Sequence, residues 1–228
     1  RLSTNIGTSL TATAVNGRTY FMLDPRLAIK WQIANNASLK LSYTHMSQSI
    51  HRMSSCFLEL PTDFWVPTTN EIKPTMSHQI AAGIYTQPTQ RLTLSLEAYY
   101  KQSSHLLQYR HWMGFQPSAA TWNRDVADGK GKSYGIEADA TYTQGSTSMS
   151  MAYTLSWSRR LFKEIYPGWF ADQFDNRHKI NISLSHSFTQ RISMYAAWTF
   201  HTGNRLTMPV GYALQPNIPG DNGYSYDY

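Results

Sequence analysis

Ser148–Trp157 reads SMSMAYTLSW, and polar and apolar residues alternate throughout this stretch. A period of two predicts a β-strand with one apolar and one polar face, because successive side chains of a strand point to opposite sides. Four further stretches repeat the pattern closely: Leu39–Thr44, Arg91–Glu97, Lys179–Ser185 and Arg191–Phe200. Apolar residues at helical spacing are hard to find in the chain. The alternation therefore predicts an all-β protein.

Weaker alternation extends this prediction to most of the chain. It marks Leu27–Ile33, Ser77–Tyr85 and Ser133–Tyr142, and Asn5–Thr13 adds a candidate strand near the start. The total is about nine strands of roughly 9–11 residues, the length expected for a tilted strand that crosses a membrane. Strands of soluble sheets typically have about 5–6 residues.

Short and long connections alternate between these strands. Tight turns are predicted near Asn35, Pro88, Gly145 and Thr189, all at one end of the sheet. The long connections are His45–Thr75, His105–Lys132, Ser158–Arg177 and residues 203–228, and the shorter Ala14–Tyr20 loop is counted with them at the outer end. Short turns at one end and long loops at the other are typical of an antiparallel up-and-down transmembrane β-barrel. A soluble barrel has no physical reason for such an asymmetry.

The two faces of the predicted strands differ in chemistry. We expect one face to contact lipid, with Leu94, Leu96, Met151, Leu155, Ile182 and Met194. The other face should line a wet lumen, with Lys40, Arg91, Glu97, Glu137, Asp139 and Lys179. A Lys or Arg on the lipid side would cost about 2–4 kcal/mol at the bilayer midplane. Aromatic residues near the predicted strand ends are typical of the girdles at membrane interfaces.

The composition excludes several other classes of protein. Charged residues make up 15% of the 228 residues and aromatic residues 14%, which argues against a charge-rich disordered chain or a coiled coil. Nowhere do roughly 18 apolar residues follow one another, so a helical membrane protein is excluded. The net charge of +6 is spread over both ends of the chain without a basic stripe, so nucleic-acid binding is not expected.

An open sheet of about nine strands cannot stand in a bilayer, because its edges would leave backbone groups unpaired in hydrocarbon. We therefore expect further strands on both sides. Residues 1–228 would form part of one transmembrane β-barrel domain.

Several short motifs, taken in order, resemble the TonB-dependent outer-membrane transporters. They are Leu60–Pro67 with Ile72–Pro74 and Ser77–Gln79, Glu97–Lys101, Gly129–Glu137, Tyr153–Ser158 with Phe162, and Phe174–His178. The resemblance covers most of the chain. It implies the C-terminal part of a barrel of about 22 strands in the outer membrane of a Gram-negative bacterium. It also implies a plug domain on which the TonB complex pulls to import a bulky nutrient. We expect the plug and the final strands to lie outside this chain.

Aromatic residues stand beside cations in the long loops. Stacking and charge-assisted hydrogen bonds from such residues suit a sugar, a peptide or a metal chelate. Alternatively, the aromatic residues pack the loops together or join the girdle. The candidate ligand-binding residues are Trp65, Tyr109, Trp112, Trp122, Arg124 and Trp169.

Two more specific kinds of site, a metal site and a catalytic site, are also alternatives. His45, His51 and His78 cluster near one loop with Cys56, but His-x3-His and Cys-x2-Cys spacings are absent, so we expect no metal or other cofactor. Ser185–Ser187 contains a histidine between serines, yet no strained strand-to-helix turn that would expose a nucleophilic serine is predicted, and we expect no enzyme activity. Asp175–His178 is instead predicted to tie down a loop base through backbone hydrogen bonds.

Two classes of function remain. The first is energised uptake of a bulky nutrient through a plugged barrel. The second is a non-energised barrel, either a passive porin or a translocator or assembly barrel for other proteins. A plug domain upstream of this segment would discriminate between them.

Overall fold

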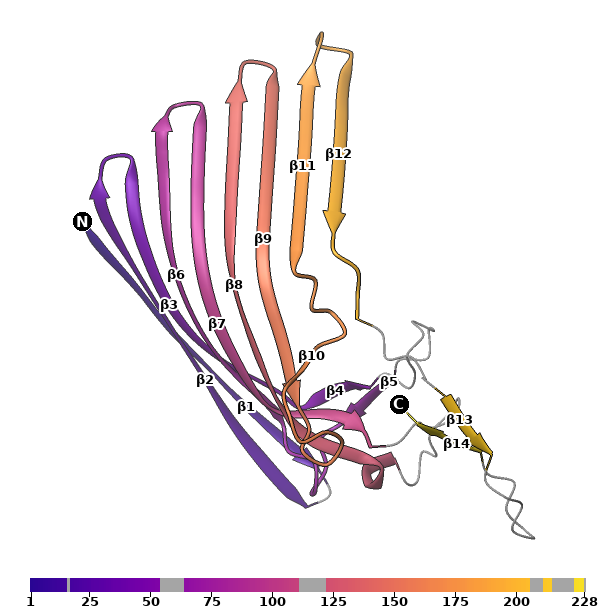
Figure 1. The fold of residues 1–228 in the computed structure, drawn as a ribbon. Coiled ribbons are helices and arrows are strands. Elements are labelled where there is room, and N and C mark those ends of the chain that lie inside the picture. The colour runs from indigo at the N-terminus through magenta and orange to yellow at the C-terminus, as the bar shows by residue number, and fades with distance from the viewer. Residues whose placement is uncertain (16, 54–63, 111–121, 206–210, 215–223, 228) are drawn as a thin grey trace.

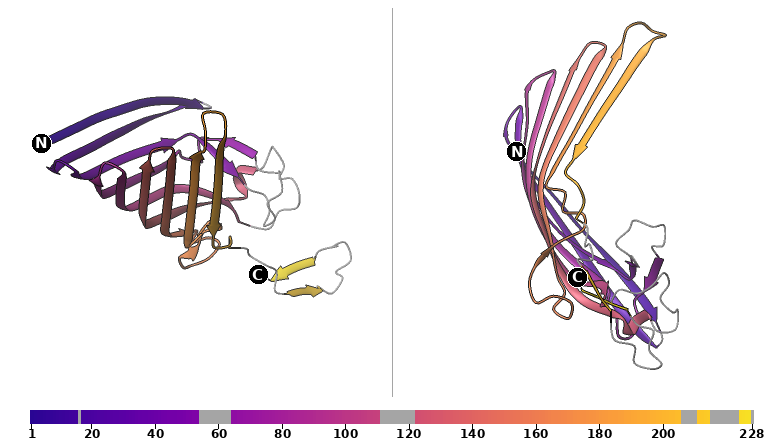
Figure 2. Two further views of the ribbon diagram at one scale, coloured as in Figure 1. Left: turned by 90° about the horizontal axis from the view of Figure 1, so that it is seen from above. Right: turned by 45° about the vertical axis from the view of Figure 1, so that its right-hand side comes forward.

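The computed structural model describes residues 1–15, 17–53, 64–110, 122–205, 211–214 and 224–227. Nine long strands form one antiparallel sheet in which each strand pairs with the next long strand in sequence (Figure 1). They are β1 (Leu2–Val15), β2 (Arg18–Ala34), β3 (Ala37–Gln48), β6 (Thr75–Thr89), β7 (Leu92–Tyr109), β8 (Val126–Gln144), β9 (Thr147–Leu161), β11 (His178–Ser187) and β12 (Ser193–His201). The predicted meander is confirmed. The sheet curves without closing, and β1 and β12 are the edges of its described part (Figure 2).

The two ends of the sheet differ as predicted. Four tight turns, which follow β2, β6, β8 and β11, lie together at the upper end in Figure 1. One expectation was wrong, because Ala14–Tyr20 is not a loop. Val15 pairs directly with Arg18, and Gly17 between them has a φ of +81°. Glycine adopts this left-handed backbone conformation without a steric penalty, which allows the chain to reverse here in a tight turn.

Two strands extend well beyond their predicted limits. The loop expected from His105 to Lys132 begins only after Tyr109, and β8 starts at Val126. His105 has a φ of +57°, and the register shifts between Ser104 and Leu106. This β-bulge adds one residue to β7, so the alternation breaks while the hydrogen-bonded ladder continues.

Cross-strand register confirms that the polar side chains share one face of the sheet. Lys40 stands opposite Gly83, Gly83 opposite Glu97, and Glu97 opposite Glu137. Thr154 follows Glu137 in this row, and Lys179 follows Thr154. Directly opposite residues of neighbouring strands lie on the same face. Asp139 lies two residues along β8 and therefore on that face too, whereas Arg91 lies in the turn before β7.

The apolar face follows from the same register. One row runs through Leu94, Ala140, Met151 and Ile182, and a second contains Leu96. Leu155 and Met194 keep the same alternation. Leu96, Met151 and Met194 are exposed, while Leu94, Leu155 and Ile182 are half-buried. The predicted separation of the two residue sets is thus confirmed for every residue except Arg91, which lies in a turn.

Small elements surround the loop end of the sheet. They are the hairpin β4 (Ile50–Met53) and β5 (Phe64–Pro67), the 3-10 turn η1 (Trp122–Arg124), β10 (Phe170–Ala171) beside β9, and the hairpin β13 (Gly211–Leu214) and β14 (Tyr224–Asp227). Met53, Val66, Ile72, Tyr109 and Val126 form a buried hydrophobic cluster here. No helix in the described part of the chain is long and apolar enough to cross a membrane.

Candidate functional site

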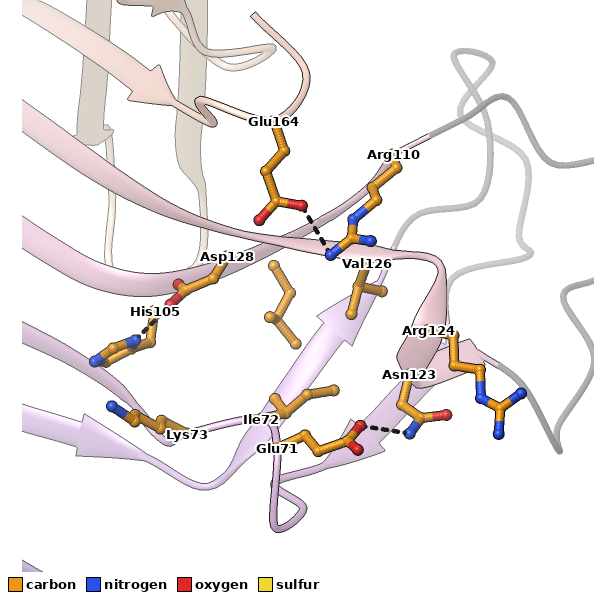
Figure 3. Close-up of a pocket in the computed structure, with 11 residues that line it drawn as sticks. Glu71, Ile72, Lys73, His105, Arg110, Asn123, Arg124, Val126, Asp128 and Glu164 are labelled. Carbon is orange, nitrogen blue, oxygen red and sulfur yellow. Dashed lines mark hydrogen bonds and ion pairs between the residues drawn. The ribbon is translucent and has the colours of Figure 1, made fainter. Parts of the chain in front are cut away.

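A cavity of about 400 Å³ lies at the loop end of the sheet, where β7 and β8 project beyond their neighbours (Figure 3). Ile72, Leu107 and Val126 give it an apolar lining. Ile72 and Val126 also belong to the buried cluster, and Leu107 packs against it. The cavity wall is therefore continuous with a packed core and does not depend on isolated loop side chains.

Polar and charged side chains form the rest of the lining, and each of its three carboxylates has a partner. Arg110 Nη2 lies 2.7 Å from Glu164 Oε2, and His105 Nδ1 lies 2.9 Å from Asp128 Oδ2. The third carboxylate belongs to Glu71. Its Oε2 accepts a hydrogen bond of 3.0 Å from the Asn123 side-chain amide.

The cations of the lining differ in whether they form an ion pair with a carboxylate. Lys73 and Arg124 both line the cavity, and neither forms an ion pair with a carboxylate among the described residues. An acidic group on a ligand would find these two cations beside an apolar surface. Charge-assisted hydrogen bonds of this kind are stronger than neutral ones.

His51 joins the β4–β5 hairpin to the strand ends near this cavity. Thr75 Oγ1 donates to the His105 carbonyl at 2.8 Å, so its bond of 3.0 Å to His51 Nδ1 requires the imidazole to donate. His51 Nε2 then accepts from Thr68 Oγ1 at 3.3 Å. The network thus places a proton on Nδ1, and the lowered pKa of the ring leaves Nε2 as an acceptor. Burial lowers the pKa of His51 from the ordinary 6.5, and the Asp128 carboxylate opposes that shift.

Three of the candidate ligand-binding residues come together at the cavity. Arg124 lines it, while Tyr109 and Trp122 form part of the hydrophobic packing behind it. Burial, with the Asp125 carboxylate nearby, raises the pKa of Tyr109 to about 12. The phenol is therefore neutral at physiological pH.

The other candidates lie elsewhere. Trp65 is 62% exposed on β5, and the ring of Trp169 stacks on Lys132, whose Nζ is 4.2 Å from the ring centroid. Neither lines the cavity. Trp112 falls outside the described residues. Sequence reasoning missed Glu71, Lys73, His105, Asn123, Asp128 and Glu164. The one available signal was the density of charges where predicted strands meet long loops.

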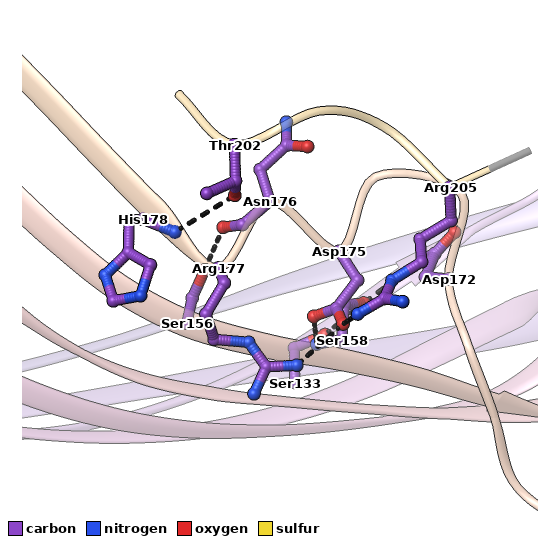
Figure 4. A network of polar contacts seen from close by, with 10 residues as sticks. All are labelled: Ser133, Ser156, Ser158, Asp172, Asp175, Asn176, Arg177, His178, Thr202 and Arg205. Atoms are coloured by element: carbon purple, nitrogen blue, oxygen red, sulfur yellow. Dashed lines mark hydrogen bonds and ion pairs between the residues drawn. The ribbon is translucent and has the colours of Figure 1, made fainter. Parts of the chain in front are cut away.

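A second polar network anchors the connection between β9 and β11 (Figure 4). Asp175 is buried, and its Oδ1 accepts a 2.8 Å hydrogen bond from the Ser158 backbone N–H. Its Oδ2 lies 2.9 Å from Arg177 Nη2 and 3.8 Å from Arg205 Nη2. Asp172 extends the network with an ion pair to Arg160. This confirms the prediction that Asp175–His178 ties down a loop base.

The geometry supports neither a metal site nor a catalytic site among the described residues. Groups of three or more His, Cys, Asp or Glu side chains suited to a metal are absent from the described residues. The His45 and His78 rings lie 4.5 Å apart, but His45 also faces Asp24 at 3.1 Å, and Cys56 falls outside the described residues. His186 bonds Thr147 at 2.8 Å.

The family model described as TonB dependent receptor-like, beta-barrel matches residues 1–227. The chain belongs to this family, which comprises transport and receptor barrels of the outer membrane and not enzymes.

Comparison with curated proteins gives no match. Among solved structures, the chain is similar to the P. putida toluene transporter TodX, at 13% identity and a TM-score of 0.40 over 86% of this chain. It is also similar to the Ralstonia pickettii toluene transporter TbuX, at 12% identity and a TM-score of 0.35 over 87% of this chain. The match covers 59% of each transporter chain.

Proposed function

We propose that this chain forms part of the wall and of the outer mouth of a plugged outer-membrane importer. The importer binds a bulky nutrient at the cell surface and takes it up with TonB-derived energy. The observation that carries the proposal is the position of the cavity, at the end of the sheet opposite the four tight turns that follow β2, β6, β8 and β11. In outer-membrane barrels the short turns face the periplasm and the longer loops face the outside.

The cavity would capture the part of the nutrient that carries an acidic group. Lys73 and Arg124 supply the charge, and Ile72 and Val126 supply the apolar contact. Trp122 supports this surface from the side of the buried cluster. A peptide, an acidic sugar or a metal chelate would satisfy this chemistry, because each combines a compact body with negatively charged oxygen atoms.

The polar face of the sheet suits a plug domain inside the lumen. Glu97 and Glu137 stand directly opposite each other, and Lys40 and Lys179 lie in the same row on either side of them. Acidic and basic groups in one row favour charged contacts with a protein surface of matching pattern. We propose the chain's own plug domain as that partner, with the TonB complex acting on the plug.

Uptake with and without a working TonB system tests the proposal. The measurement is cargo accumulation or growth on the cargo, normalised to surface-exposed barrel. We expect uptake to require TonB, and Lys73→Gln with Arg124→Gln to reduce uptake about 100-fold or more, since charge-assisted hydrogen bonds contribute roughly 1.5–3 kcal/mol each. Arg205→Gln, a cation of the Asp175 network, is the matched control.

Uptake that persists undiminished without TonB would contradict energised import. A non-energised barrel, a passive porin or a protein translocator, would then be the better account. Unchanged uptake by the Lys73 and Arg124 variant would contradict cargo capture in the cavity but not energised import.

A further inference from the structure

Three aromatic side chains form a continuous row on the apolar face of β7, β8 and β9. Tyr100 stands opposite Tyr134, and Tyr134 stands opposite Trp157. Their ring centroids are 6.4 Å and 5.4 Å apart, and both pairs are stacked. Aromatic rows of this kind mark the level at which lipid hydrocarbon meets the polar headgroups. The row lies toward the loop end, so it marks the outer of the two interfaces.

A row that contains two cations, Lys132 and Arg159, follows immediately beyond the aromatic row on the same face. Gln102 stands opposite Lys132, and Lys132 stands opposite Arg159. Each lies two residues from an aromatic residue of the first row, so the period of two places them on the apolar side of the wall. Lys130 continues the series one step further.

An aromatic ring holds one cation of this row, Lys132, in place. The Trp169 ring stacks on Lys132, with Nζ 4.2 Å from the ring centroid. Such cation–π contacts orient an ammonium group without neutralising its charge. The guanidinium of Arg177 lies 4.7 Å from the ring centroid of Trp157 in the aromatic row, although its charge is partly balanced by Asp175.

The surrounding carboxylates do not neutralise the row. Asp128 lies two residues from Lys130 but pairs with His105 at 2.9 Å. Within the described part of the chain, no ion pair joins Lys130, Lys132 or Arg159 to a carboxylate. Arg159 and Lys130 are exposed and Lys132 is half-buried. This surface therefore presents positive charge at headgroup depth.

We propose that Lys130, Lys132 and Arg159, with Trp169, bind the phosphate groups of the phosphorylated glycolipid that forms the outer leaflet. Charge complementarity selects this occupant, because a phosphate offers several acceptor oxygens to Lys and Arg. The stacked rings beside the cations would contact the sugar and the upper acyl chains. The inference concerns the outside of the wall and is independent of the cargo and of TonB.

The test uses the full-length protein, purified in detergent and freed of bound lipid. The probes are lipid A with two phosphates and the same lipid after enzymatic removal of both, with binding followed by native mass spectrometry. The double variant Lys132→Gln with Arg159→Gln should bind the phosphorylated lipid roughly 25-fold more weakly, about fivefold for each cation at a lipid surface.

The matched control removes two cations from the polar face at similar height. Arg26 and Lys101 lie in one row there, through Thr44 and Gln79, and Arg26→Gln with Lys101→Gln should change lipid binding by less than twofold. Trp169→Leu should cost about threefold, because the cations remain but lose their support. An equal loss in the control, or an unchanged affinity in the Lys132 and Arg159 variant, would overturn the inference.

The lipid comparison stands even if the double variant fails to assemble. Heat-modifiable migration on a gel shows whether each variant is folded. If the wild-type protein binds the dephosphorylated lipid as tightly as lipid A, phosphate recognition is refuted. These measurements need neither cargo nor TonB, so failure of the import proposal would not affect them.

Discussion

The wall of β6–β9 and the cluster at its loop end are built from the same strands but held together in different ways. In the wall, each side chain meets partners that the register dictates, such as Leu96 opposite Ile84. At the loop end, side chains far apart in sequence meet, as Glu71 and Asn123 do. The wall should therefore be sensitive to changes of backbone spacing and of face. The loop end should be sensitive to the loss of individual polar contacts.

A glycine in the wall provides the largest expected effect. A Cβ added at Gly135 would lie 2.6 Å from the Leu155 backbone oxygen on the next strand, and a hydrogen-bonded backbone has no freedom to move aside. We expect Gly135→Val to prevent most of the barrel from assembling, measured as heat-modifiable protein in the outer membrane.

Gly129→Val is the comparison at the loop end. Its Cβ would lie 2.4 Å from the ring of Phe162, a side chain. This variant should assemble, with increased proteolysis of the β9–β11 connection. Similar assembly defects in both variants would contradict the proposed difference between the regions.

A charge on the apolar face provides the next largest effect. Leu96→Lys should destabilise the assembled barrel by about 2–4 kcal/mol, the cost of a lysine that faces lipid near the midplane. Glu97→Lys introduces the same side chain one residue away on the polar face, opposite Glu137, and should be nearly neutral. Urea-dependent refolding into lipid vesicles measures both variants. A larger cost for Glu97→Lys would reverse the assignment of the faces.

Asp175→Asn tests the polar network at the loop end. The asparagine still accepts the Ser158 N–H but leaves the partly buried Arg177 without its charged partner. We expect a local loss of roughly 1–3 kcal/mol, seen as faster hydrogen exchange in residues 158–177 with unchanged exchange in β7. Ser156→Ala, which removes the 3.3 Å bond to the Asn176 carbonyl, is a milder control. Exchange that rises throughout the sheet would show that the network supports the wall as well.

Acidification provides the smallest expected effect. The pKa of buried His51 is lowered, so the folded state binds fewer protons than the unfolded state. The stability of the β4–β5 hairpin should be complete above pH 6.5 and fall as the pH drops below it.

The groups that face His51 are Thr68, Thr75, His105 and Asp128. Hydrogen exchange in residues 64–68, corrected for its intrinsic pH dependence, should be faster at pH 5.5 than at pH 7.5. His51→Gln should abolish the difference, and a difference that persists in this variant would contradict the role of His51.

The strands and their faces were predictable because alternation is a local property that each strand carries in its own residues. The row of Lys40, Glu97, Glu137 and Lys179 could be assigned to one face without knowledge of the register. The prediction for Asp175 was also confirmed, because a short polar side chain beside the start of a strand is well placed to accept a backbone hydrogen bond. Arg124 was predicted as a ligand-binding residue from its aromatic neighbours, and the structure places it on the cavity lining.

The remaining features depend on contacts between distant parts of the chain. The bulge at His105 interrupts the alternation, so the sequence predicted an end of β7 that is too early. The tight turn at Gly17 was predicted as a loop. The pairing of Arg110 with Glu164, the burial of Tyr109 and the alignment of Lys132 with Arg159 arise only when neighbouring strands adopt their register. Local periodicity thus determined the strands, the faces and the family resemblance. Tertiary structure decided which charges meet at the cavity and on the outer wall, because register and loop packing bring together residues that no local pattern connects.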